Sequence, residues 1–538
     1  MNRKVNIFAL IILLSACGGG GSDSSAPPAT GGGPIVVAPP VLAGLASAQN
    51  PITGNCSVAN GGSVFTNAEV EPSVAINPRE ANNLIGAWQQ DRWSNGGANG
   101  VVSGYSTDGG NSWQISTAPF SRCTGGTATN GGDYERATDP WVSFSPNGTA
   151  YQMALGFNGN TFTAGSASAM LVSRSTDGGR SWSNPATLIR DGAQFFNDKN
   201  MLVADPVATR NAYAVWDRLA PTGNGPTWFA RTVDSGATWE PAKLIYDPGT
   251  LSQTIGNIMV VLPNGTLINA FTQLDPIARG NTQASLNIIR STNSGATWSA
   301  PVRIAEILSV GARAPDSGAF IRDAAIIPSL AVGPAGELYI VWQDARFTDG
   351  VRDQVAISRS LDAGLTWSPP ARVNADTSVP AFIPTVHVRA DGLVGVSYFD
   401  FRSNTADPST LPTDYWLARS RDGVTWSESR IGAVFDFFHA PNTPRGYFIG
   451  DYMALTSAGN QFMAFYVRAN GDAANNTDVF ATPITVAVNA LESKRAATEP
   501  APAISDELRA RVGKRNSEIF ARRVPGWKHP FPLRALRR

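Results

Sequence analysis

The sequence is poor in the side chains that bind metals and carry redox chemistry. Its 538 residues include 3 His and 3 Cys, which is too few for a zinc site, and no acidic loop has EF-hand spacing. No glycine-rich phosphate loop joins a strand to a helix, and no serine-centred nucleophile elbow occurs. We therefore expect no metal and no cofactor, and nucleotide chemistry is not predicted.

A net charge is also missing. Lys and Arg together number 42, Asp and Glu together number 42, and the formal net charge is +0. A neutral chain has no overall attraction for nucleic acid, so no nucleic-acid partner is predicted. The apolar run at 5–14 is too short to span a bilayer as a helix.

The N-terminus instead resembles a bacterial lipoprotein signal. Arg3 and Lys4 precede the apolar run, which ends in the letters LSAC at 14–17. The resemblance implies that residues 1–17 are a signal peptide and that Cys17 is lipidated. We expect a protein exported to the bacterial cell envelope and held in the outer membrane or at the cell surface. The alternative is an ordinary cleaved signal and a secreted protein.

Export has consequences for the other two cysteines, Cys56 and Cys123. Because exported proteins fold in an oxidising compartment, we expect a disulfide between them, with two unpaired thiols as the alternative.

Composition divides the rest of the chain. Residues 18–50 are rich in Gly, Ser, Ala and Pro and form an expected flexible tether, and residues 51–485 form the folded domain.

Residues 486–538 have a different character. From residue 494 onward, twelve Lys and Arg stand against four Asp and Glu, and we expect a basic, largely disordered tail. Within it, residues 505–523 could form a short basic helix capped by Ser505. Contact with an anionic membrane surface and a solvated chain are both open for this tail.

One short phrase occurs six times in the middle of the chain. It ends in a tryptophan each time, at intervals of 57 to 69 residues. The copies are STDGGNSW at 106–113, STDGGRSW at 175–182, TVDSGATW at 232–239, STNSGATW at 291–298, SLDAGLTW at 360–367 and SRDGVTW at 420–426. The polar residues and glycines suit a tight turn, and the tryptophan suits an apolar anchor. We expect each phrase to close a hairpin, with its Asp structural rather than catalytic.

Between these phrases the chain alternates in the manner of short strands, four to a repeat. Four-stranded antiparallel units repeated about an axis form a β-propeller, so we predict an all-β fold of that kind. The apolar pattern of an innermost strand occurs seven times, which favours seven blades over six. The last blade is expected to borrow a strand from the segment just before Glu71.

A second phrase marks the end of the second strand in several repeats: an aromatic residue, then Asp, then Arg. These pairs are Asp91/Arg92, Asp217/Arg218, Asp344/Arg346 and Asp400/Arg402. Strand topology directs them toward the face that carries the long loops, where binding residues concentrate. They could bind an anionic ligand, or they could be ion pairs that fix turns within each blade. Repetition favours the second interpretation for most of them.

The same face should receive other charged residues from the starts of the innermost strands. Glu71, Asp139 and Asp323 are of this kind. The stretch 445–453 adds Arg445, Tyr447, Asp451 and Tyr452, and His439 lies just upstream.

The six phrases have the form S-x-D-x-G-x-[ST]-W and resemble the Asp boxes of the sialidase (neuraminidase) superfamily, over residues 65–485. In that family three arginines bind the sugar carboxylate, an Asp is the acid/base and a Tyr–Glu pair is the nucleophile. The resemblance implies Tyr452 as nucleophile, Asp91 as acid, and Glu71, from geometry, as partner. The family's first arginine has no counterpart at 70–73. Substrate-binding candidates are Arg92, Arg218, Arg346, Arg402, Arg445 and Asp451.

Three functions follow from these residues. The first is a monomeric exo-α-sialidase-like glycoside hydrolase that acts on an acidic glycan, because retaining hydrolysis needs a nucleophile and an acid/base. The second is a polysaccharide lyase that uses His439, Tyr447 and Arg445 on uronate-containing chains. The third is a propeller that binds glycans or proteins without turnover.

Overall fold

The computed structural model describes residues 44–47, 50–54, 56, 58, 60–323, 325–485 and 503–531. Cys17, the signal peptide and most of the expected tether lie outside these ranges. Of the helices in the described part of the chain, none combines the length and the hydrophobicity that crossing a bilayer requires.

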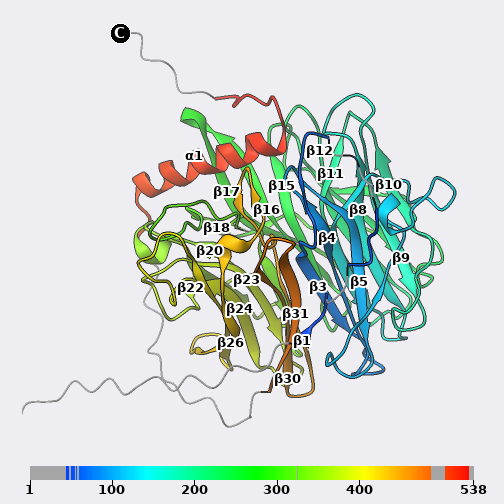
Figure 1. Ribbon diagram of the computed structural model, residues 1–538. Helices are drawn as coiled ribbons and strands as arrows, with labels where there is room; N and C mark the ends of the chain where they lie inside the picture. Colours follow the sequence, from blue (N-terminus) through cyan, green and yellow to red (C-terminus); the bar gives the residue numbers. More distant parts are fainter. Residues whose placement is uncertain are drawn as a thin grey trace, which may run out of the picture. The chain divides into compact units, whose positions relative to one another are not determined.

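The fold is all-β and propeller-like, and consists of four-stranded antiparallel sheets in which sequential strands are neighbours (Figure 1). We name each sheet by its innermost strand. The first sheets comprise β3 (Val70–Ile76), β4 (Leu84–Trp93), β5 (Ala98–Ser106) and β6 (Gln114–Ser116); β7 (Arg136–Phe144), β8 (Ala150–Asn158), β9 (Ala167–Ser175) and β10 (Ala186–Asp191); and β11 (Phe196–Ala204), β12 (Ala212–Leu219), β13 (Thr227–Thr232) and β14 (Lys243–Tyr246).

The following sheets have the same order. They comprise β15 (Gln253–Val261), β16 (Leu267–Ile277), β17 (Asn281–Ser291) and β18 (Val302–Glu306); β19 (Ser329–Val332), β20 (Leu338–Asp344), β21 (Gln354–Ser360) and β22 (Ala371–Arg372); and β23 (Ala381–Val388), β24 (Val394–Asp400), β25 (Pro412–Ser420) and β26 (Ser427–Asp436). The β3 and β7 sheets also touch through the pair Ala98 and Ala137, and β2 (Val64–Phe65) pairs with β4.

The last sheet is completed by a strand from the other end of the chain. It contains β29 (Ala454–Ala458), β30 (Gln461–Asp472) and β31 (Asn475–Thr485), and its outer strand is β1 (Gly44–Leu45). Gly44 faces Ala481 and Leu45 faces Phe480 in this pairing. The prediction that an N-terminal strand completes the last unit is confirmed, but its position was wrong, because β1 does not lie just before Glu71 and instead falls within residues 18–50, the expected tether.

Side chains between neighbouring sheets hold the sheets together. Ile85 and Ala87 pack against Val142 and Phe144 between the β3 and β7 sheets, and similar apolar clusters lie between the sheets that follow. The ring of Phe465, on β30, lies 6.4 Å from that of Trp88, so the last sheet packs against the β3 sheet. Burial of these side chains is the main stabilising contribution to the arrangement.

The repeated phrases form turns between the third and fourth strands. In the TVDSGATW copy, Asp234 Oδ1 accepts from the Thr238 amide at 2.9 Å and Oδ2 accepts from the Thr238 hydroxyl at 2.6 Å. In the STNSGATW copy, Asn293 replaces the Asp and keeps the same partner, with Oδ1 accepting from the Thr297 amide at 2.9 Å. The turn therefore forms without a carboxylate, as a structural role predicts.

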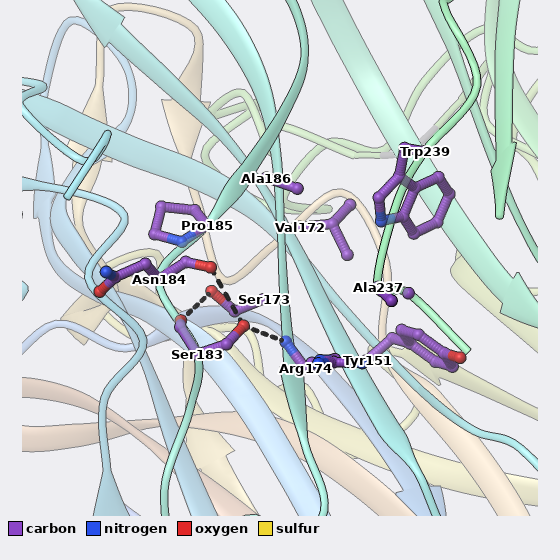
Figure 2. Close-up of a pocket in the computed structure, with 11 residues that line it drawn as sticks. Tyr151, Val172, Ser173, Arg174, Ser183, Asn184, Pro185, Ala186, Ala237 and Trp239 are labelled. Carbon is purple, nitrogen blue, oxygen red and sulfur yellow. Dashed lines mark hydrogen bonds between the residues drawn. The ribbon is translucent and has the colours of Figure 1, made fainter. Parts of the chain in front are cut away.

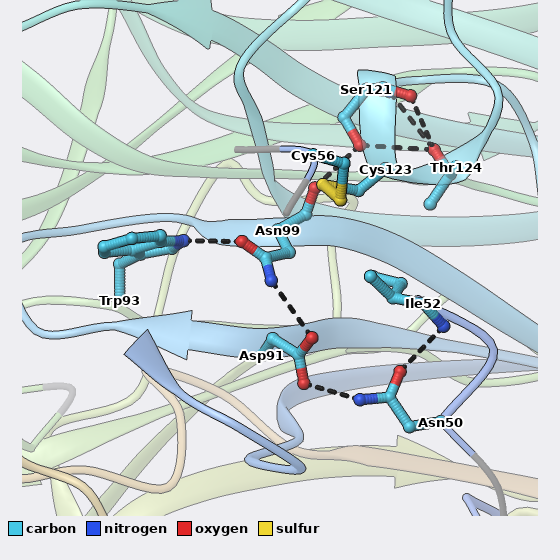
Figure 3. Close-up of a disulfide and its surroundings, with 9 residues drawn as sticks. All are labelled: Asn50, Ile52, Cys56, Asp91, Trp93, Asn99, Ser121, Cys123 and Thr124. Carbon is cyan, nitrogen blue, oxygen red and sulfur yellow. Dashed lines mark hydrogen bonds between the residues drawn. A yellow bond between two sulfur atoms is a disulfide. The ribbon is translucent and has the colours of Figure 1, made fainter. Parts of the chain in front are cut away.

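Two further predictions concern the ends of the folded region. The disulfide between Cys56 and Cys123 is present, with a Cα–Cα distance of 5.1 Å (Figure 3). Near the C-terminus, α1 spans Asp506–Arg523, and the Ser505 hydroxyl accepts from the Leu508 amide, as expected for its cap. Residues 503–531 differ from the expected largely disordered tail because α1 buries Leu508, Val512 and Phe520.

Short elements occupy the long connections. The 3₁₀ helices are η1 (Arg122–Thr124), η2 (Ala278–Gly280), η3 (Arg346–Thr348) and η4 (Phe437–His439). A two-stranded hairpin, β27 (Asn442–Thr443) and β28 (Gly446–Tyr447), follows η4 and leads to the site described next.

Candidate functional site

Several innermost strands carry a β-bulge at the same place. The register shifts in β3, β7, β11, β15 and β23. At each shift one residue has a positive φ, and these residues are Glu71 (φ 54), Asp139 (φ 54), Lys199 (φ 48), Gly256 (φ 66) and Ile383 (φ 52). Residues other than glycine rarely adopt this conformation, and bulges turn side chains away from the regular alternation. Three consecutive sheets thus each contribute one charged bulge residue.

These three residues meet Asp451, which precedes β29. Lys199 Nζ lies 2.6 Å from Asp451 Oδ2, 3.5 Å from Glu71 Oε1 and 3.7 Å from Asp139 Oδ1. Only 11% of the Lys199 side chain is exposed, so this is a buried cluster of one amine and three carboxylates. Burial alone would lower the pKa of Lys199, but Asp139, Asp451 and Glu71 raise it above its usual value.

Arg322 binds the same carboxylate from another side. Its Nη2 lies 2.7 Å from Asp451 Oδ2 and its Nε lies 3.2 Å from Oδ1, which is a bidentate pair. Burial would raise the pKa of Asp451, but Arg322 and Lys199 hold it well below its usual range. Asp451 is therefore ionised and held by two cations, so its role is to anchor Arg322 and Lys199.

Two more guanidinium groups lie near Arg322. The Arg92 and Arg322 guanidinium carbons lie 4.8 Å and 3.9 Å from the centre of the Phe448 ring. Burial, and then the charge of Arg322, lower the pKa of Arg92 to about 10. The charge of the nearby Arg322 lowers the pKa of Arg445 to about 9. Three arginines thus repel one another in one place, as expected where an anion binds.

The two outer arginines have spare binding capacity. Arg92 Nη1 donates to Gln89 Oε1 at 2.7 Å, and its buried Nε has no hydrogen-bond partner. The Arg445 side chain is exposed, and no described carboxylate lies within ion-pair distance of it. Within this cluster four cations, Lys199, Arg92, Arg322 and Arg445, stand against three carboxylates, Glu71, Asp139 and Asp451.

Asp139 and Glu71 form a carboxyl pair. Burial, and then the nearby charge of Glu71 and its hydrogen bond, raise the pKa of Asp139 to about 8, against the opposing effect of Lys199. Glu71 also accepts a hydrogen bond from the Gln89 side-chain amide. Asp139 is therefore protonated at neutral pH and can act as a proton donor.

Tyr452 lies beside this pair. Its hydroxyl donates to the carbonyl oxygen of Pro140 at 3.3 Å, and its ring lies 5.6 Å from that of Trp141. Burial, and then the charge of Glu71, raise the pKa of Tyr452 well above its usual value. The sequence placed Tyr452, Glu71, Asp451, Arg92 and Arg445 in one site, and the structure brings all five to this cluster.

Asp91 does not belong to the cluster. Its Oδ1 accepts from Asn50 Nδ2 at 2.7 Å and its Oδ2 accepts from Asn99 Nδ2 at 3.0 Å (Figure 3). Its Oδ1 also accepts from the Asn67 backbone amide at 2.9 Å. A carboxylate that is buried among these donors fixes the local chain near the disulfide. We correct the expectation that Asp91 is the acid, because the adjacent Arg92 faces the cluster and Asp91 faces away from it.

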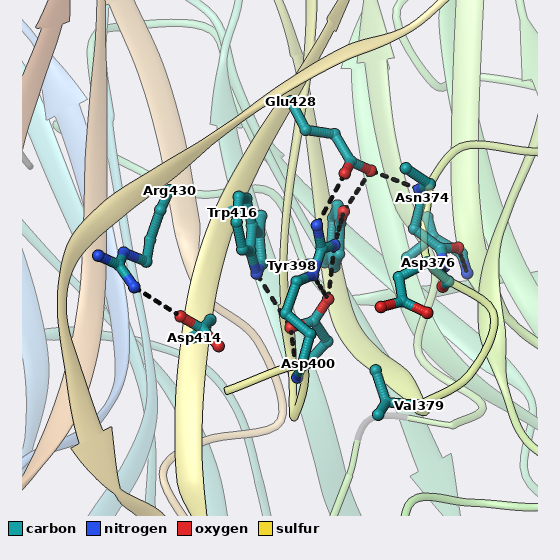
Figure 4. A network of polar contacts seen from close by, with 12 residues as sticks. Asn374, Asp376, Val379, Tyr398, Asp400, Asp414, Trp416, Glu428 and Arg430 are labelled. Atoms are coloured by element: carbon teal, nitrogen blue, oxygen red, sulfur yellow. Dashed lines mark hydrogen bonds and ion pairs between the residues drawn. The ribbon is translucent and has the colours of Figure 1, made fainter. Parts of the chain in front are cut away.

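The remaining arginines of the aromatic–Asp–Arg phrase form ion pairs within their sheets. Arg218 pairs with Asp191 at 2.6 Å, and Arg346 pairs with Asp344 at 2.8 Å. Arg402 pairs with Asp400 at 2.6 Å and with Glu428 at 3.0 Å, in the network around Tyr398 (Figure 4). These three arginines were substrate-binding candidates, and the structure corrects this, since their guanidinium groups are occupied by carboxylates.

The three residues proposed for a lyase, His439, Tyr447 and Arg445, make no hydrogen bonds with one another among the described residues. Tyr447 packs against Phe438 with tilted rings whose centres are 4.9 Å apart. His439 is exposed. No hydrogen bond joins His439 to Arg445 among the described residues, so they do not form an acid–base pair here.

A surface hollow lies apart from this cluster. This hollow of 280 Å³ lies beside the turns of the second and third phrases, lined by Tyr151, Arg174 and Trp239 among others (Figure 2). It holds a single charged side chain and no carboxyl group, so it offers no acid–base chemistry. Within the described ranges no group of His, Cys, Asp or Glu is arranged to hold a metal ion.

Lys199 and Arg322 are site residues that the sequence analysis missed. Lys199 had a detectable signal, because it occupies the same place in the pattern of its innermost strand as Glu71 and Asp139. Arg322 had none, because it lies in the long irregular connection between β18 and β19.

No model of a protein family matches this sequence, and no curated protein matches it. Solved structures do resemble it. A protein of unknown function from Dyadobacter fermentans has a TM-score of 0.43 and 15% identity, over 79% of this chain and 98% of its own. An α-L-arabinanase from Penicillium chrysogenum has a TM-score of 0.41 and 11% identity, over 78% and 97%. A sialidase from Streptococcus pneumoniae has a TM-score of 0.37 and 13% identity, over 81% and 71%.

Proposed function

We propose that this protein is an exported glycoside hydrolase, sialidase-like in its chemistry, that removes a carboxylate-bearing sugar from a glycan. The observation that carries the proposal is the convergence of Arg92, Arg322 and Arg445 near the buried cluster that contains Asp139 and Glu71. We further propose that the four-stranded sheets are seven blades, closed by β1. Lipidation of Cys17 and a monomeric state stay predictions from the sequence.

Binding of the sugar carboxylate follows from the spare donors. Among the described residues Arg445 forms no ion pair, Arg92 has an unused buried N–H, and Arg322 is held in place by Asp451. Guanidinium groups bind carboxylates through paired N–H donors, and the bond is strong where water is excluded. Repulsion among the three arginines lowers the pKa of Arg92 and Arg445. A bound carboxylate would relieve this repulsion.

Hydrolysis would use the carboxyl pair and Tyr452. Asp139 gives its proton to the glycosidic oxygen as the bond to the anomeric carbon breaks. The Tyr452 oxygen bonds to that carbon while its proton passes to Glu71, and water later replaces the tyrosine with Asp139 as base. A tyrosine suits this step because the sugar carboxylate would repel an anionic nucleophile. Tyr452 must first release the Pro140 carbonyl oxygen, which it binds in this structure.

One observation favours a second function, carboxylate binding without turnover. Lys199 lies within ion-pair distance of both Glu71 and Asp139, and the Tyr452 hydroxyl is engaged by a backbone oxygen. A site arranged in this way could bind a sugar acid and leave it intact. The Tyr452→Phe variant separates the two functions, because it should abolish turnover and retain binding if Tyr452 is the nucleophile.

The first experiment is a panel of glycans that carry sialic or uronic acids, assayed for reducing ends and for ultraviolet absorbance. New reducing ends without absorbance would identify hydrolysis, absorbance from an unsaturated product would identify a lyase, and binding without either product would identify the second function. An absence of both binding and turnover across the panel would contradict the proposal.

Arg445→Ala tests the carboxylate site on whichever glycan responds. Because Arg445 is exposed and unpaired, the variant should fold normally, and its Kd or KM should rise by about a hundredfold. Arg421→Ala is the matched control. Arg421 lies in the repeated phrase at 420–426 and is also exposed, but it pairs with Asp391 at 2.9 Å. Equal affinity in the two variants would remove Arg445 from the site.

A further inference from the structure

Helix α1 lies across one end of several sheets (Figure 1). Leu508 and Val512 pack against Leu308, and Phe520 is fully buried in the cluster that contains the β15 and β19 sheets. Asn516 Nδ2 donates to the carbonyl oxygen of Thr282 at 3.2 Å. The helix is therefore bound to the sheets along its whole length, by apolar and polar contacts together.

The C-terminal half of α1 places two arginines on carboxylates that each adjoin a site cation. Arg523 Nη2 lies 3.4 Å from Asp198 Oδ2, and the next residue after Asp198 is Lys199. Arg515 Nη2 lies 3.1 Å from Asp323 Oδ1, and the residue before Asp323 is Arg322. The helix thus reaches the candidate site through its two neighbouring carboxylates.

A third carboxylate, that of Asp217, forms an ion pair with an arginine of the same helix. Arg523 also binds Asp217, which is fully buried. If Asp198, Asp217 and Asp323 are added to Glu71 and Asp451, five carboxylates stand against the four site cations, with Asp139 left out because it is protonated. Arg515 and Arg523 bring the cations to six. Without α1, this region would have a surplus of negative charge, which would compete for Lys199 and Arg322 and repel an anionic sugar.

We propose that α1 is part of the carboxylate-binding site, with Arg515 and Arg523 as positioning residues that neutralise Asp323 and Asp198. Lys199 and Arg322 then remain directed at Asp451 and the ligand. This inference rests on the proposed function for its ligand, but the placement of the two site cations can be measured without one.

The test uses the full chain and the variants Arg515→Gln and Arg523→Gln. Arg522→Gln is the matched control, because Arg522 is exposed on the same helix and pairs with Glu518 at 3.6 Å. Hydrogen exchange of 196–200 and 320–323 reports the placement of Lys199 and Arg322. Calorimetry with free N-acetylneuraminic acid and glucuronic acid reports binding.

We expect Arg523→Gln to speed exchange at 196–200 and Arg515→Gln to speed exchange at 320–323, while the control changes neither. Affinity for the sugar acid should fall about tenfold in each, with melting temperatures near that of the wild type. Adding Asp323→Asn to Arg515→Gln, or Asp198→Asn to Arg523→Gln, should restore exchange and affinity, because the charge that the arginine neutralised is gone. A purely structural role would not be rescued in this way.

Exchange and affinity equal to those of the control, or a failure of both rescues, would overturn the inference. If Arg523→Gln does not fold, because Asp217 is left buried without a cation, the Arg515 and Asp323 pair carries the test. If the wild type binds neither sugar acid while exchange changes and is rescued, the proposed function fails and the positioning role of α1 stands.

Discussion

At the scale of single residues, the unusual feature is that charged residues have a backbone conformation that glycine adopts more easily. Glu71, Asp139 and Lys199 each have a positive φ at a bulge. A strained conformation of this kind costs roughly 1 kcal/mol or more per residue. Because the three side chains meet in one buried cluster, the strain points to selection for the site rather than for stability.

The first residue-scale prediction concerns Asp139. With a pKa of about 8, Asp139 is protonated below that pH, so activity should fall as the pH rises through 8. Asp139→Asn should lower kcat by about 10²- to 10⁴-fold on natural glycans, the usual contribution of a general acid, and far less on a 4-nitrophenyl glycoside, whose leaving group needs no proton. Measurement of kcat on both substrates checks this.

Asp91→Asn is the control for that prediction, because Asp91 lies one residue from Arg92 and contacts three asparagines instead of the cluster. It should keep the wild-type ratio of the two rates. A stability measurement is independent of turnover: since the folded pKa of Asp139 is raised, the free energy of unfolding should fall as the pH rises toward 8, and Asp139→Asn should lack this fall. A parallel fall in both proteins would contradict the assignment.

The residues of the site were only partly predictable. Arg92, Arg445, Asp451, Tyr452 and Glu71 follow from positions relative to strands, which a repeat makes readable. The acid was assigned to Asp91 because it adjoins an arginine at a strand end, but successive residues of a strand point to opposite sides, so only one of the two can face the cluster. Which of two neighbouring residues faces a site depends on how the strand pairs and twists within the sheet. A short sequence phrase does not contain this information.

At the scale of elements, the repeated turn is held by hydrogen bonds, and it forms whether its central residue is a charged Asp or a neutral Asn. The Asp234 carboxylate accepts from the Thr238 amide and hydroxyl and from the Thr232 hydroxyl, and Asn293 makes the equivalent bonds with an amide. Such turns were predicted in full because each depends on residues within one eight-residue phrase. The helix α1 was predicted in its bounds but not in its docking, which depends on carboxylates of distant sheets.

Replacement of Asp234 tests the turn. Asp234→Ala should lower the free energy of unfolding at pH 7 by about 1 kcal/mol, since three hydrogen bonds are lost at an exposed position. Asp234→Asn should cost less, because Asn293 already supports the same geometry. The hydrogen bonds hold the pKa of Asp234 at about 2, below the ordinary 3.8, so the wild-type advantage over Asn should shrink as the pH falls between these values.

Urea unfolding of the three proteins at pH 7 and near pH 2.5 measures these differences. Glycan turnover should be unchanged in both variants, because the turn lies outside the charged cluster. A loss of turnover with unchanged stability would mean that the repeated Asp is functional after all.

At the scale of the whole molecule, the two ends of the folded region are joined in the last sheet. Beyond the β1 pairing, the Ala46 amide donates to the Val479 carbonyl oxygen at 2.8 Å, and the Ser47 hydroxyl accepts from the Val479 amide at 2.9 Å. This closure was predictable because the last repeat contains one strand too few. Propeller architectures protect their sheet edges by such closure, since an open edge exposes unpaired backbone groups.

Closure can be tested by shortening the chain at two places. A protein that begins at residue 44 keeps β1, and one that begins at residue 50 loses it while keeping Cys56 and its disulfide. The second should melt at least about 2 °C lower, because backbone hydrogen bonds and the burial of Ala46 are lost. It should also self-associate more at high concentration, because the edge of β31 is left unpaired. Calorimetry and sedimentation measure the two effects, and identical melting of the two proteins would show that β1 does not hold the last sheet to the rest.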